Sequence, residues 1–591
     1  MEDYMQEAVR EHLSEAAALN VIEWLTKPKF SEYKTELKSM IASEKWRDIE
    51  DAFFKEIEFG TGGRRGIVGV GSNRINNVTI GESAQALCSY AEQSDANAST
   101  KGIVIGCDTR LSSPELSKYV ARVAAANGFK TYIFESFRST PELSFAVRKL
   151  GCAVGVVITA SHNAPEYNGF KAYWNDGAQL VPPHDEGVLK KAEDIEKINV
   201  LEDYNQAVID GKIIEIGSEI DDAYLKAVLD ERLGENTDLK IAYSPLHGAG
   251  QRNTLPVLQA AGFDVITVKD QMTPDGHFPT MEDGRANPEK KLANTRVVAL
   301  MHAEGADIAI SNDPDADRLG IMVRQGEHTK YLSGNQTAVL VTEYALRKMS
   351  EQNKLSNRHY IAKTIVTTDM LDSIANKYNV ESVNNLHVGF KWICEVISKR
   401  EKKGGIFVTG SEESFGLMKG SYTRDKDGAV SLLIAEYAAE LKSEGKTLYD
   451  RMLELYQEYG LYTEYLTTAT CEGAKGFEDM QRIMKSLRDN PINELEGNNV
   501  TALLDYQTLE RKDLATGNVS KVDCIKGNVL VYEFGDKRRR ITIRPSGTEP
   551  IMKFYVQWYD STSTSENDYN TTMEALEDLA NELEGLALER A

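Results

Sequence analysis

The sequence lacks several features that would assign it to other protein classes. Its 591 residues include only six cysteines, which are widely scattered and form no Cys-x-x-Cys pair. Neither a disulfide framework nor a cysteine zinc site is therefore predicted, and we expect small buried thiols in a reducing, cytoplasmic compartment. No apolar run is long enough to span a membrane. The acidic N-terminal stretch lacks the apolar segment of a signal peptide.

Positive charge is also scarce. The chain has 68 Lys and Arg residues against 91 Asp and Glu, which gives a formal net charge of −23. Such a chain lacks the cationic face that nucleic acid or an anionic membrane surface requires. A small anionic ligand is still allowed, because it responds to the few cations that line its pocket. A Walker phosphate loop is missing as well, since Glu440 stands where the Gly445-Lys446-Thr447 ending requires glycine.

Short apolar runs that alternate with helical stretches dominate what is present. Residues 1–58 show helical spacing, and strands are then predicted at 102–106, 130–134 and 153–158. The alternation begins again near residue 239 and near residue 360, which is the βαβ pattern of mostly parallel sheets. From residue 461 onward, alternating β-rich runs predict an α+β domain with an antiparallel sheet.

The expected fold class is therefore α/β, with three tandem α/β mixed-sheet domains and a C-terminal α+β domain. No low-complexity linker separates them, so close packing is expected. We expect an N-terminal helical extension at 1–58, followed by domains at 59–215, 216–330, 331–460 and 461–591.

Four polar segments each follow an apparent strand, the place where ligands bind in open α/β sheets. In the first, Thr159-Ala-Ser-His-Asn163, the strand delivers Ser161 to a turn where its hydroxyl can carry a phosphoryl group. The same residues also fit a plain turn capped by Ser161 and Asn163.

The second segment is Asp313-Pro-Asp-Ala-Asp-Arg318, in which Asp313, Asp315 and Asp317 occupy alternate positions. Three carboxylates so spaced can converge on one hard cation such as Mg²⁺. A solvated acidic loop is the alternative. A calcium EF-hand is excluded, because the sixth loop position is not glycine.

The third segment, Gly410-Ser-Glu-Glu-Ser-Phe-Gly416, places Glu412 and Ser414 between glycines, where they suit vicinal sugar hydroxyls; a plain polar turn fits equally. The fourth, Arg544-Pro-Ser-Gly-Thr-Glu-Pro550, offers guanidinium, hydroxyl and backbone donors for a phosphate dianion. It also fits a turn that closes a hairpin.

Together with Phe59-Gly-Thr-Gly-Gly-Arg-Arg-Gly66, these segments resemble the α-D-phosphohexomutase family, the phosphoglucomutases and phosphomannomutases. They stand in the family's order over residues 59–550. The resemblance implies four domains around a central cleft and a phosphorylated Ser161. It also implies one Mg²⁺ per chain, bound by the phosphoryl oxygen on Ser161 together with Asp313, Asp315 and Asp317.

The resemblance further implies roles for individual residues. The reacting centre would be lined by Arg65, His162, Lys171 and Arg318. Lys171 would transfer the proton, as a base only if burial or nearby cations lower its pKa. The sugar side would include Lys391, Glu412, Ser414 and Arg424. The non-reacting phosphate would be held by Arg544, Ser546, Gly547 and Thr548.

The implied activity is the interconversion of glucose 1-phosphate and glucose 6-phosphate through a phosphoserine and glucose 1,6-bisphosphate. The sequence departs from many relatives at Asn163-Ala-Pro165 and at Phe390, where several dual-specificity relatives carry histidine. The GSEESFG loop favours glucose over mannose, with phosphomannomutase and phosphopentomutase activities as alternatives. A sugar phosphatase would not need the RPSGTEP loop, and a non-catalytic sensor would not need Ser161 with all three aspartates. Monomer and dimer both stay open.

Overall fold

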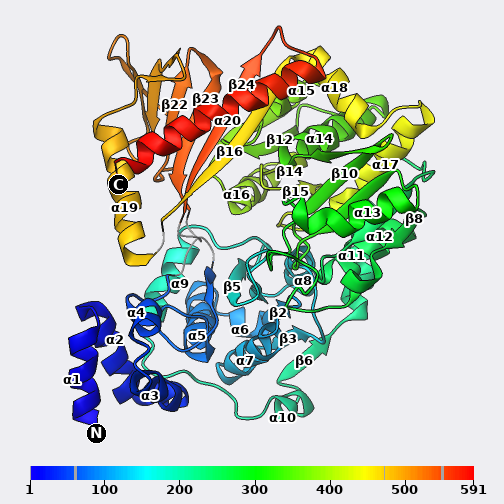
Figure 1. Cartoon of the computed structure of the whole chain (residues 1–591). Coiled ribbons are helices and arrows are strands. Elements are labelled where there is room, and N and C mark those ends of the chain that lie inside the picture. Colours follow the sequence, from blue (N-terminus) through cyan, green and yellow to red (C-terminus); the bar gives the residue numbers. More distant parts are fainter. Residues whose placement is uncertain (1, 59–62, 472, 547–550, 591) are drawn as a thin grey trace. The chain divides into compact units, whose positions relative to one another are not determined.

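The computed structural model describes residues 2–58, 63–471, 473–546 and 551–590. The chain forms two compact units, and Figure 1 shows its elements in sequence colours. Unit 1 comprises Met1–Arg232, Lys240–Gly320 and Gly420–Leu432. Unit 2 comprises Leu233–Leu239, Ile321–Lys419 and Leu433–Ala591.

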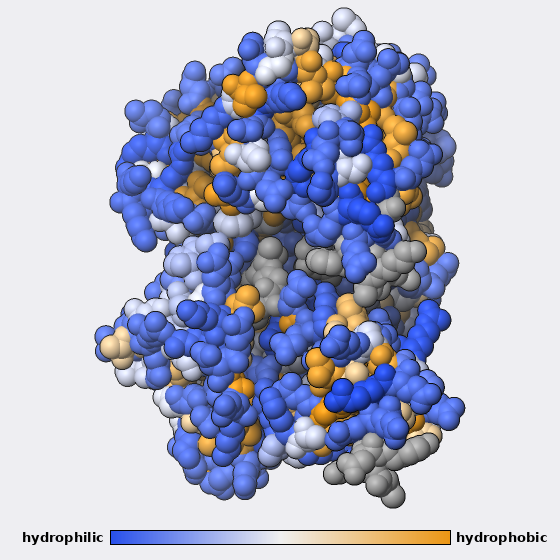
Figure 2. Space-filling view, turned by 90° about the vertical axis from the view of Figure 1, so that its left-hand side faces the viewer, coloured by the Kyte–Doolittle hydropathy of each residue, from blue (hydrophilic) through white to orange (hydrophobic). Residues whose placement is uncertain are grey.

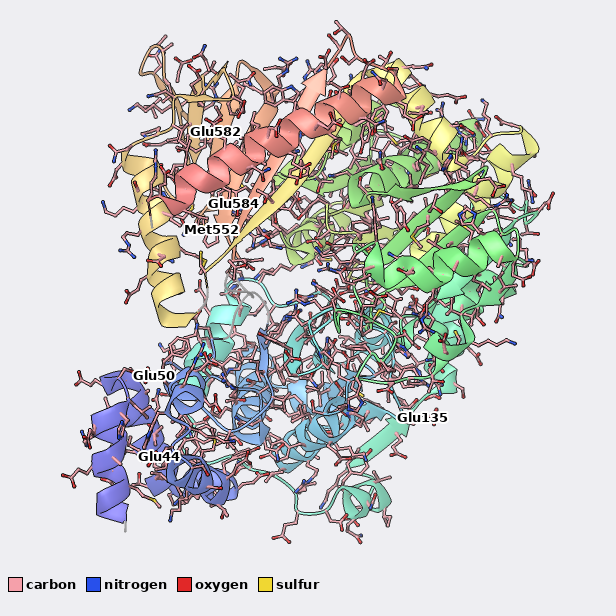
Figure 3. The ribbon with its side chains drawn as sticks, in the orientation of Figure 1. Glu44, Glu50, Glu135, Met552, Glu582 and Glu584 are labelled. Carbon is pink, nitrogen blue, oxygen red and sulfur yellow. The ribbon has the colours of Figure 1, made fainter. Side chains whose placement is uncertain are left out.

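The N-terminal stretch is helical, as the sequence predicts. Its helices are α1 (Glu2–His12), α2 (Glu15–Thr26), α3 (Lys34–Ala42) and α4 (Trp46–Phe53). They share an apolar core in which Trp24 stacks on Phe30 and meets Phe53 edge-on. Glu50 of α4 accepts hydrogen bonds from the backbone and hydroxyl of Ser14, the residue that caps α2 (Figure 3). The helices of this stretch therefore pack around an apolar core, to which residues beyond 58 also contribute, and are linked by side-chain hydrogen bonds.

The first α/β part of unit 1 is built on a six-stranded sheet in the order β1-β5-β4-β2-β3-β6. Strand β2 runs parallel to β3 and β4, whereas β5 is antiparallel to both β1 and β4. The strands predicted at 102–106, 130–134 and 153–158 are confirmed as β2, β3 and β4; β1, β5 and β6 were not anticipated. The strands are β1 (Gly63–Ile67), β2 (Ile103–Cys107), β3 (Thr131–Phe134), β4 (Val154–Ile158), β5 (Tyr167–Trp174) and β6 (Ile213–Ile216).

Helices surround this sheet because their apolar faces join its core. Each of α7 and α8 carries a proline in its first turn, where the missing N–H is tolerated. The helices are α5 (Asn77–Ser94), α6 (Ala98–Lys101), α7 (Ser113–Ala126), α8 (Thr140–Leu150), α9 (His184–Glu193) and α10 (Tyr204–Ile209).

The second α/β part of unit 1 has three parallel strands, in which β7 lies between β8 and β9. They are β7 (Lys240–Ser244), β8 (Asp264–Thr267) and β9 (Ile308–Asn312), with helices α11 (Ser218–Leu229), α12 (Thr254–Ala260) and α13 (Thr295–Ala303). The chain leaves unit 1 within β10 (Leu319–Gln325), which forms an antiparallel hairpin with β11 (His328–Leu332).

The α/β part of unit 2 has a four-stranded sheet in the order β13-β12-β14-β15, with only β15 antiparallel to its neighbour. Its strands are β12 (His359–Thr364), β13 (Glu381–Leu386), β14 (Ile406–Ser411) and β15 (Leu417–Lys419). Its helices are α14 (Gly334–Glu351), α15 (Met370–Lys377), α16 (Phe390–Glu401), α17 (Ser431–Ser443) and α18 (Leu448–Tyr459).

The last part of unit 2 is β-rich, as predicted, with an antiparallel sheet in the order β16-β24-β23-β22-β19-β20-β21. Helix α20 runs along this sheet (Figure 1), and Glu584 of α20 accepts a hydrogen bond from Thr467 Oγ1 of β16 at 2.7 Å (Figure 3). The elements are β16 (Leu461–Thr470), α19 (Gly473–Asp489), β17 (Glu494–Leu495), β18 (Asn498–Asn499), β19 (Ala502–Asp505), β20 (Glu510–Asp513), β21 (Val519–Lys521), β22 (Leu530–Phe534), β23 (Asp536–Pro545), β24 (Ile551–Asp560) and α20 (Glu566–Leu588).

The surface is consistent with the strongly charged composition. Hydrophilic residues cover most of the face drawn in Figure 2, and hydrophobic residues appear there in separate groups. None of the helices in the described ranges combines the length and apolar content needed to cross a membrane.

Candidate active site

Ser161 lies in a tightly fixed loop directly after β4. Its backbone N–H donates to Thr159 Oγ1 at 2.8 Å, and that hydroxyl donates to Asp108 Oδ2 at 2.6 Å. Ser161 adopts a φ of 50°, in the left-handed region that non-glycine residues rarely occupy. Such strain persists only where the surroundings impose it, and it is concentrated at functional sites. The loop is therefore more than a solvent-exposed capped turn.

Arg110, which lies in none of the sequence motifs, fixes the backbone of the same loop. Its guanidinium donates to the backbone carbonyls of Ser161 at 2.7 Å, Ala164 at 2.8 Å and Tyr167 at 2.9 Å, and also to that of Asn163. Arg110 is buried, because it follows β2 in the stretch Cys107-Asp-Thr-Arg110. In the sequence, the charged residues Asp108 and Arg110 directly after an apolar strand could have drawn attention to this position. They do not indicate that Arg110 contacts the Ser161 loop.

The three aspartates lie together in the loop that follows β9. Asp313, Asp315 and Asp317 are each at most 1% exposed, and one oxygen from each lies within 4.8 Å of the others. Ser161 Oγ donates to Asp313 Oδ2 at 2.6 Å. The solvated acidic loop considered from sequence is therefore wrong, because these carboxylates are buried beside Ser161.

The remaining carboxylate oxygens fit a bound cation. Lys171 Nζ of β5 donates to Asp315 Oδ2 at 2.7 Å and to Asp317 Oδ2 at 3.2 Å. The Oδ1 atoms of Asp315 and Asp317 are buried and receive no hydrogen bond from any described residue. Burying unpaired carboxylate oxygens is costly unless a cation compensates them. An oxygen-only ligand set of this kind suits Mg²⁺.

The electrostatics of the cluster differ from one carboxyl to the next. Burial and the neighbouring Asp315 and Asp317 raise the pKa of Asp313 well above its usual range. Burial also opposes ionisation of Asp315, but Lys171 outweighs it and lowers the pKa of Asp315. Burial disfavours the Lys171 ammonium, yet Asp315 and Asp317 raise its pKa. The condition for Lys171 to act as a base, a pKa lowered by burial or nearby cations, is therefore not met.

The other predicted residues of the reacting centre also lie in unit 1. Arg65 of β1 donates to Asn163 Oδ1 at 3.1 Å, and His162 Nδ1 lies 3.2 Å from Ser161 Oγ. Arg318 donates its backbone N–H to Asp313 Oδ1 at 3.0 Å and forms an ion pair with Glu289. The structure thus brings the predicted phosphoserine, metal and cationic residues together within one unit.

The segment 420–432 belongs to unit 1, although the sequence places it within the expected domain 331–460. Tyr173 of β5 donates to Asp425 Oδ2 at 2.7 Å, and Lys426 Nζ lies 3.6 Å from Asp317 Oδ1. Arg424 is buried and donates to the carbonyls of Ser421 and Thr423. These Arg424 contacts hold the loop itself, while Lys426 is a cation beside the aspartates that was not singled out.

The predicted sugar residues other than Arg424, and the predicted phosphate residues that the structure describes, lie in unit 2. Glu412 and Lys391 are 4% and 5% exposed, and Phe415 beside Ser414 has a φ of 61°. Burial and Glu412 raise the pKa of Glu413, whereas Lys553 and Arg544 oppose that rise. The Glu413 carboxyl therefore lies within the electrostatic reach of Arg544.

The Arg544 segment joins β23 to β24, and Ser546 N donates to Ile551 O at 2.8 Å. The hairpin turn considered from sequence is thus present between β23 and β24. A role in phosphate binding is compatible with this turn, because a turn also presents backbone N–H donors. Gly547 and Thr548 lie outside the described residues.

Three family models match successive parts of the chain. They describe α/β/α domains I, II and III of phosphoglucomutase/phosphomannomutase, and they match residues 56–199, 222–326 and 333–459. The phosphoglucomutase of Staphylococcus aureus strain MRSA252 is 35% identical over 520 residues, covering 87% of this chain and 92% of that protein.

Two solved structures share the fold. A putative phosphomannomutase from Thermus thermophilus is 22% identical with a TM-score of 0.63, covering 90% of this chain and 99% of that one. The open form of pp63/parafusin, a phosphoglucomutase from Paramecium, is 18% identical with a TM-score of 0.63, covering 91% and 95% respectively.

Proposed function

The chain belongs to the phosphoglucomutase/phosphomannomutase family and is a phosphohexomutase, and we propose that it interconverts α-D-glucose 1-phosphate and glucose 6-phosphate through a phosphorylated Ser161. The observation that carries this proposal is the contact of Ser161 Oγ with Asp313 in the buried three-aspartate cluster. A hydroxyl and a cation site are thereby adjacent, as phosphoryl transfer requires.

The proposed reaction has two transfers. The phosphoryl group on Ser161 moves to the free hydroxyl of the sugar phosphate, so one P–O bond breaks as another forms. The resulting glucose 1,6-bisphosphate turns end for end and returns its other phosphoryl group to Ser161. In each transfer, the accepting hydroxyl loses a proton and the departing oxygen gains one. Lys171 is the proposed proton-transfer residue: its raised pKa favours the protonated form, which would donate to the departing oxygen and then recover the proton that the accepting hydroxyl loses.

The metal proposed for this centre is one Mg²⁺ per chain, held by Asp313, Asp315 and Asp317 with the phosphoryl oxygen on Ser161. When bound, it would neutralise charge on the transferring group. Arg65, His162 and Arg318 add donors and positive charge around the same loop. Arg110 keeps the backbone of the Ser161 loop in place through its bonds to four carbonyls.

A second binding region is proposed in unit 2. Glu412 and Ser414 would bind sugar hydroxyls, with Lys391 beside them. Arg544, Ser546, Gly547 and Thr548 would hold whichever phosphate is not reacting. The influence of Arg544 on Glu413 supports this pairing of a sugar loop with a phosphate loop. The assignment of Arg424 to the sugar has less support, because its guanidinium donates hydrogen bonds to backbone carbonyls.

Two further parts of the proposal concern the whole chain. We propose the cytoplasm as its place of action, because all six cysteines lie within described ranges and are free thiols. We also propose the domain boundaries that the sequence predicts, with a helical extension at 1–58 and domains at 59–215, 216–330, 331–460 and 461–591.

The decisive experiment replaces Ser161 with alanine. Intact-mass measurement of the purified wild type should show a phosphate-sized adduct that Ser161→Ala lacks, and the variant should have no measurable mutase turnover. Ser117→Ala is the matched control, because this buried serine of α7 lies outside the four motif segments and donates to Pro114 O. An unchanged kcat in Ser161→Ala, or a persisting adduct, contradicts the proposal. Release of inorganic phosphate without isomerisation would favour a phosphatase instead.

The preferred sugar is tested with glucose, mannose, glucosamine and ribose 1-phosphates. Glucose 1-phosphate should give the highest kcat/KM of the four. This part of the proposal rests on Glu412 and Ser414 in the GSEESFG loop and on the phosphoglucomutase name of the Staphylococcus aureus relatives. A higher value for mannose or ribose 1-phosphate contradicts the glucose assignment without affecting the role of Ser161.

A further inference from the structure

Thr140, which lies in none of the four motifs, contacts Asp315 of the aspartate cluster at two points. Its hydroxyl donates to Asp315 Oδ2 at 2.8 Å, and its backbone N–H donates to Asp315 O at 2.9 Å. Thr140 is the first residue of α8 and is fully buried. One residue thus fastens both the carboxylate and the backbone of Asp315.

The hydroxyl bond determines which carboxylate oxygen is available. Asp315 Oδ2 accepts from Thr140 Oγ1 and also from Lys171 Nζ at 2.7 Å. A carboxylate oxygen has two lone pairs, so these two donors occupy Oδ2. Asp315 Oδ1 is buried and meets no donor in the part of the chain that the structure describes. The arrangement therefore turns Oδ1 toward a ligand other than a protein hydrogen-bond donor.

Thr140 is itself held in a defined position. Ser139 precedes it as the N-cap of α8, and Ser139 Oγ accepts from Glu142 N at 3.2 Å and from Asn253 Nδ2 at 2.9 Å. Pro141 follows it within the first helical turn, which fixes the backbone further. A β-branched threonine also has restricted χ1 freedom. The hydroxyl is thus presented by a rigid element rather than by a mobile side chain.

We propose that Thr140 is a positioning residue for the divalent-cation site, holding the Asp315 carboxylate so that Oδ1 faces the ion. The proposal rests on the proposed function, in which the three aspartates bind Mg²⁺. Groups that orient metal ligands through hydrogen bonds typically contribute roughly 10- to 100-fold to metal affinity. Thr140 would touch neither substrate nor metal, and would act only through Asp315.

The test compares Thr140→Val, which keeps the branched shape without the donor, with Thr140→Ser, which keeps the donor. Mn²⁺ binding to the full chain is followed by electron paramagnetic resonance in the absence of substrate, so the readout does not depend on catalysis. Thr140→Val should weaken Mn²⁺ binding by roughly 10- to 100-fold, and Thr140→Ser should restore it to within about threefold of wild type.

Thr131→Val is the matched control. Thr131 is also fully buried in unit 1, and its hydroxyl donates to the carbonyl of Phe129. This variant should bind Mn²⁺ like the wild type. If Thr140→Val does not fold, Thr140→Ala provides the same loss of donor with less steric demand, and the expectation is unchanged.

Activity provides a second readout that a purely structural role would not reproduce. Thr140→Val should need a higher Mg²⁺ concentration for half-maximal turnover, while kcat at saturating Mg²⁺ stays within about tenfold of wild type because the ligands themselves are intact. Wild-type Mn²⁺ affinity in both Thr140→Val and Thr140→Ala overturns the inference alone. A wild-type chain that binds no Mn²⁺ overturns the proposed metal site and the inference with it.

Discussion

Two groups of charged side chains, one in each unit, balance their charges in opposite ways. In unit 2, Asp369 Oδ1 accepts from Lys363 Nζ at 2.7 Å and from Arg540 NH2 at 2.9 Å, and its Oδ2 accepts from Arg540 NH1. In unit 1, the Oδ1 atoms of Asp315 and Asp317 accept no hydrogen bond from a described residue, although Lys426 Nζ lies 3.6 Å from Asp317 Oδ1. The first group, here called the Asp369 clamp, consists of Lys363, Asp369 and Arg540.

The pKa values of Asp369 and Asp313, one carboxyl from each group, are shifted in opposite directions. Burial opposes ionisation of Asp369, but Lys363 and Arg540 outweigh it and lower its pKa. Burial and two neighbouring carboxylates instead raise the pKa of Asp313. Charged side chains that pair with one another, as in the Asp369 clamp, are compatible with a stable fold. Carboxylates that lack such partners lower the stability of the fold until a cation binds. The incomplete group is therefore the functional one, and the two should respond oppositely to neutralisation.

The largest expected effect is that of Asp313→Asn on turnover. Losing one anionic ligand should reduce Mg²⁺-dependent kcat by roughly a thousandfold, since metal-ion charge stabilisation supplies several kcal/mol. Because burial and two neighbouring carboxylates disfavour the ionised form of Asp313, neutralising it should at the same time raise the unfolding temperature in excess chelator. Steady-state kinetics and thermal unfolding of the same preparation check both signs. An Asp313→Asn chain that is fully active, or that unfolds at a lower temperature in chelator, removes the contrast.

In the Asp369 clamp, neutralisation should act on stability instead. Asp369→Asn leaves the buried Lys363 and the largely buried Arg540 without their counter-charge, which should cost about 3–5 kcal/mol. Thermal or urea unfolding measures the loss. The matched control is Glu381→Gln, which breaks the exposed pair with Arg400 and should cost at most about 1 kcal/mol. Equal effects of the two variants would show that burial of the clamp does not matter.

Arg544→Ala should lower mutase kcat/KM by roughly tenfold to several hundredfold, because charge-assisted hydrogen bonds are worth about 1.5–3 kcal/mol each. Spontaneous dephosphorylation of the enzyme should change far less, since water carries no second phosphate. Arg539→Ala is the control from the same strand, because Arg539 lies outside the Arg544 segment and its Nε donates to Tyr559 O. If Arg544→Ala slows both reactions equally, the loop is structural and the two-region proposal fails.

The loops at the ends of strands show most clearly how much of the candidate site could be predicted from the sequence. Strands β4 and β9 are fully buried, and β4 and the first three residues of β9 are apolar, so the polar residues after these runs could be recognised as ligand-side loops. Ser161 and the three aspartates were found in this way. The hairpins β10–β11 and β19–β20 were not, because their strands are short or mixed in polarity.

The residues that position the site could not be predicted from sequence. Thr140 is 175 residues from Asp315, and Arg110 is 51 residues from Ser161, so only the fold brings them together. The direction of the Lys171 pKa shift also depends on which carboxylates face the ammonium. Likewise, nothing in the chain order indicates that the segment 420–432 packs in unit 1.

The smallest expected effect concerns Glu464, a carboxyl on β16 beside the Asp369 clamp. Burial raises the pKa of Glu464 to about 7; the Thr368 hydroxyl lowers it, Asp369 raises it, and Lys363 and Arg540 lower it. The folded chain therefore keeps a proton that the unfolded chain releases between its ordinary pKa of about 4.3 and pH 7. Stability from this group is fully present below that range and is lost as the pH rises through about 7.

Glu464→Gln removes this titration while keeping a neutral side chain of the same size. The fall in unfolding free energy between pH 5 and pH 7.5 should therefore shrink by about 2 kcal/mol, because one proton contributes about 1.4 kcal/mol per pH unit. Urea unfolding across that pH range measures the change, and the exposed Glu574→Gln on α20 serves as control. A wild-type slope retained in Glu464→Gln would mean that the Lys363 and Arg540 cations keep Glu464 ionised. The Asp369 clamp would then satisfy one more carboxylate than proposed, and its contrast with the aspartate cluster of unit 1 would be sharper still.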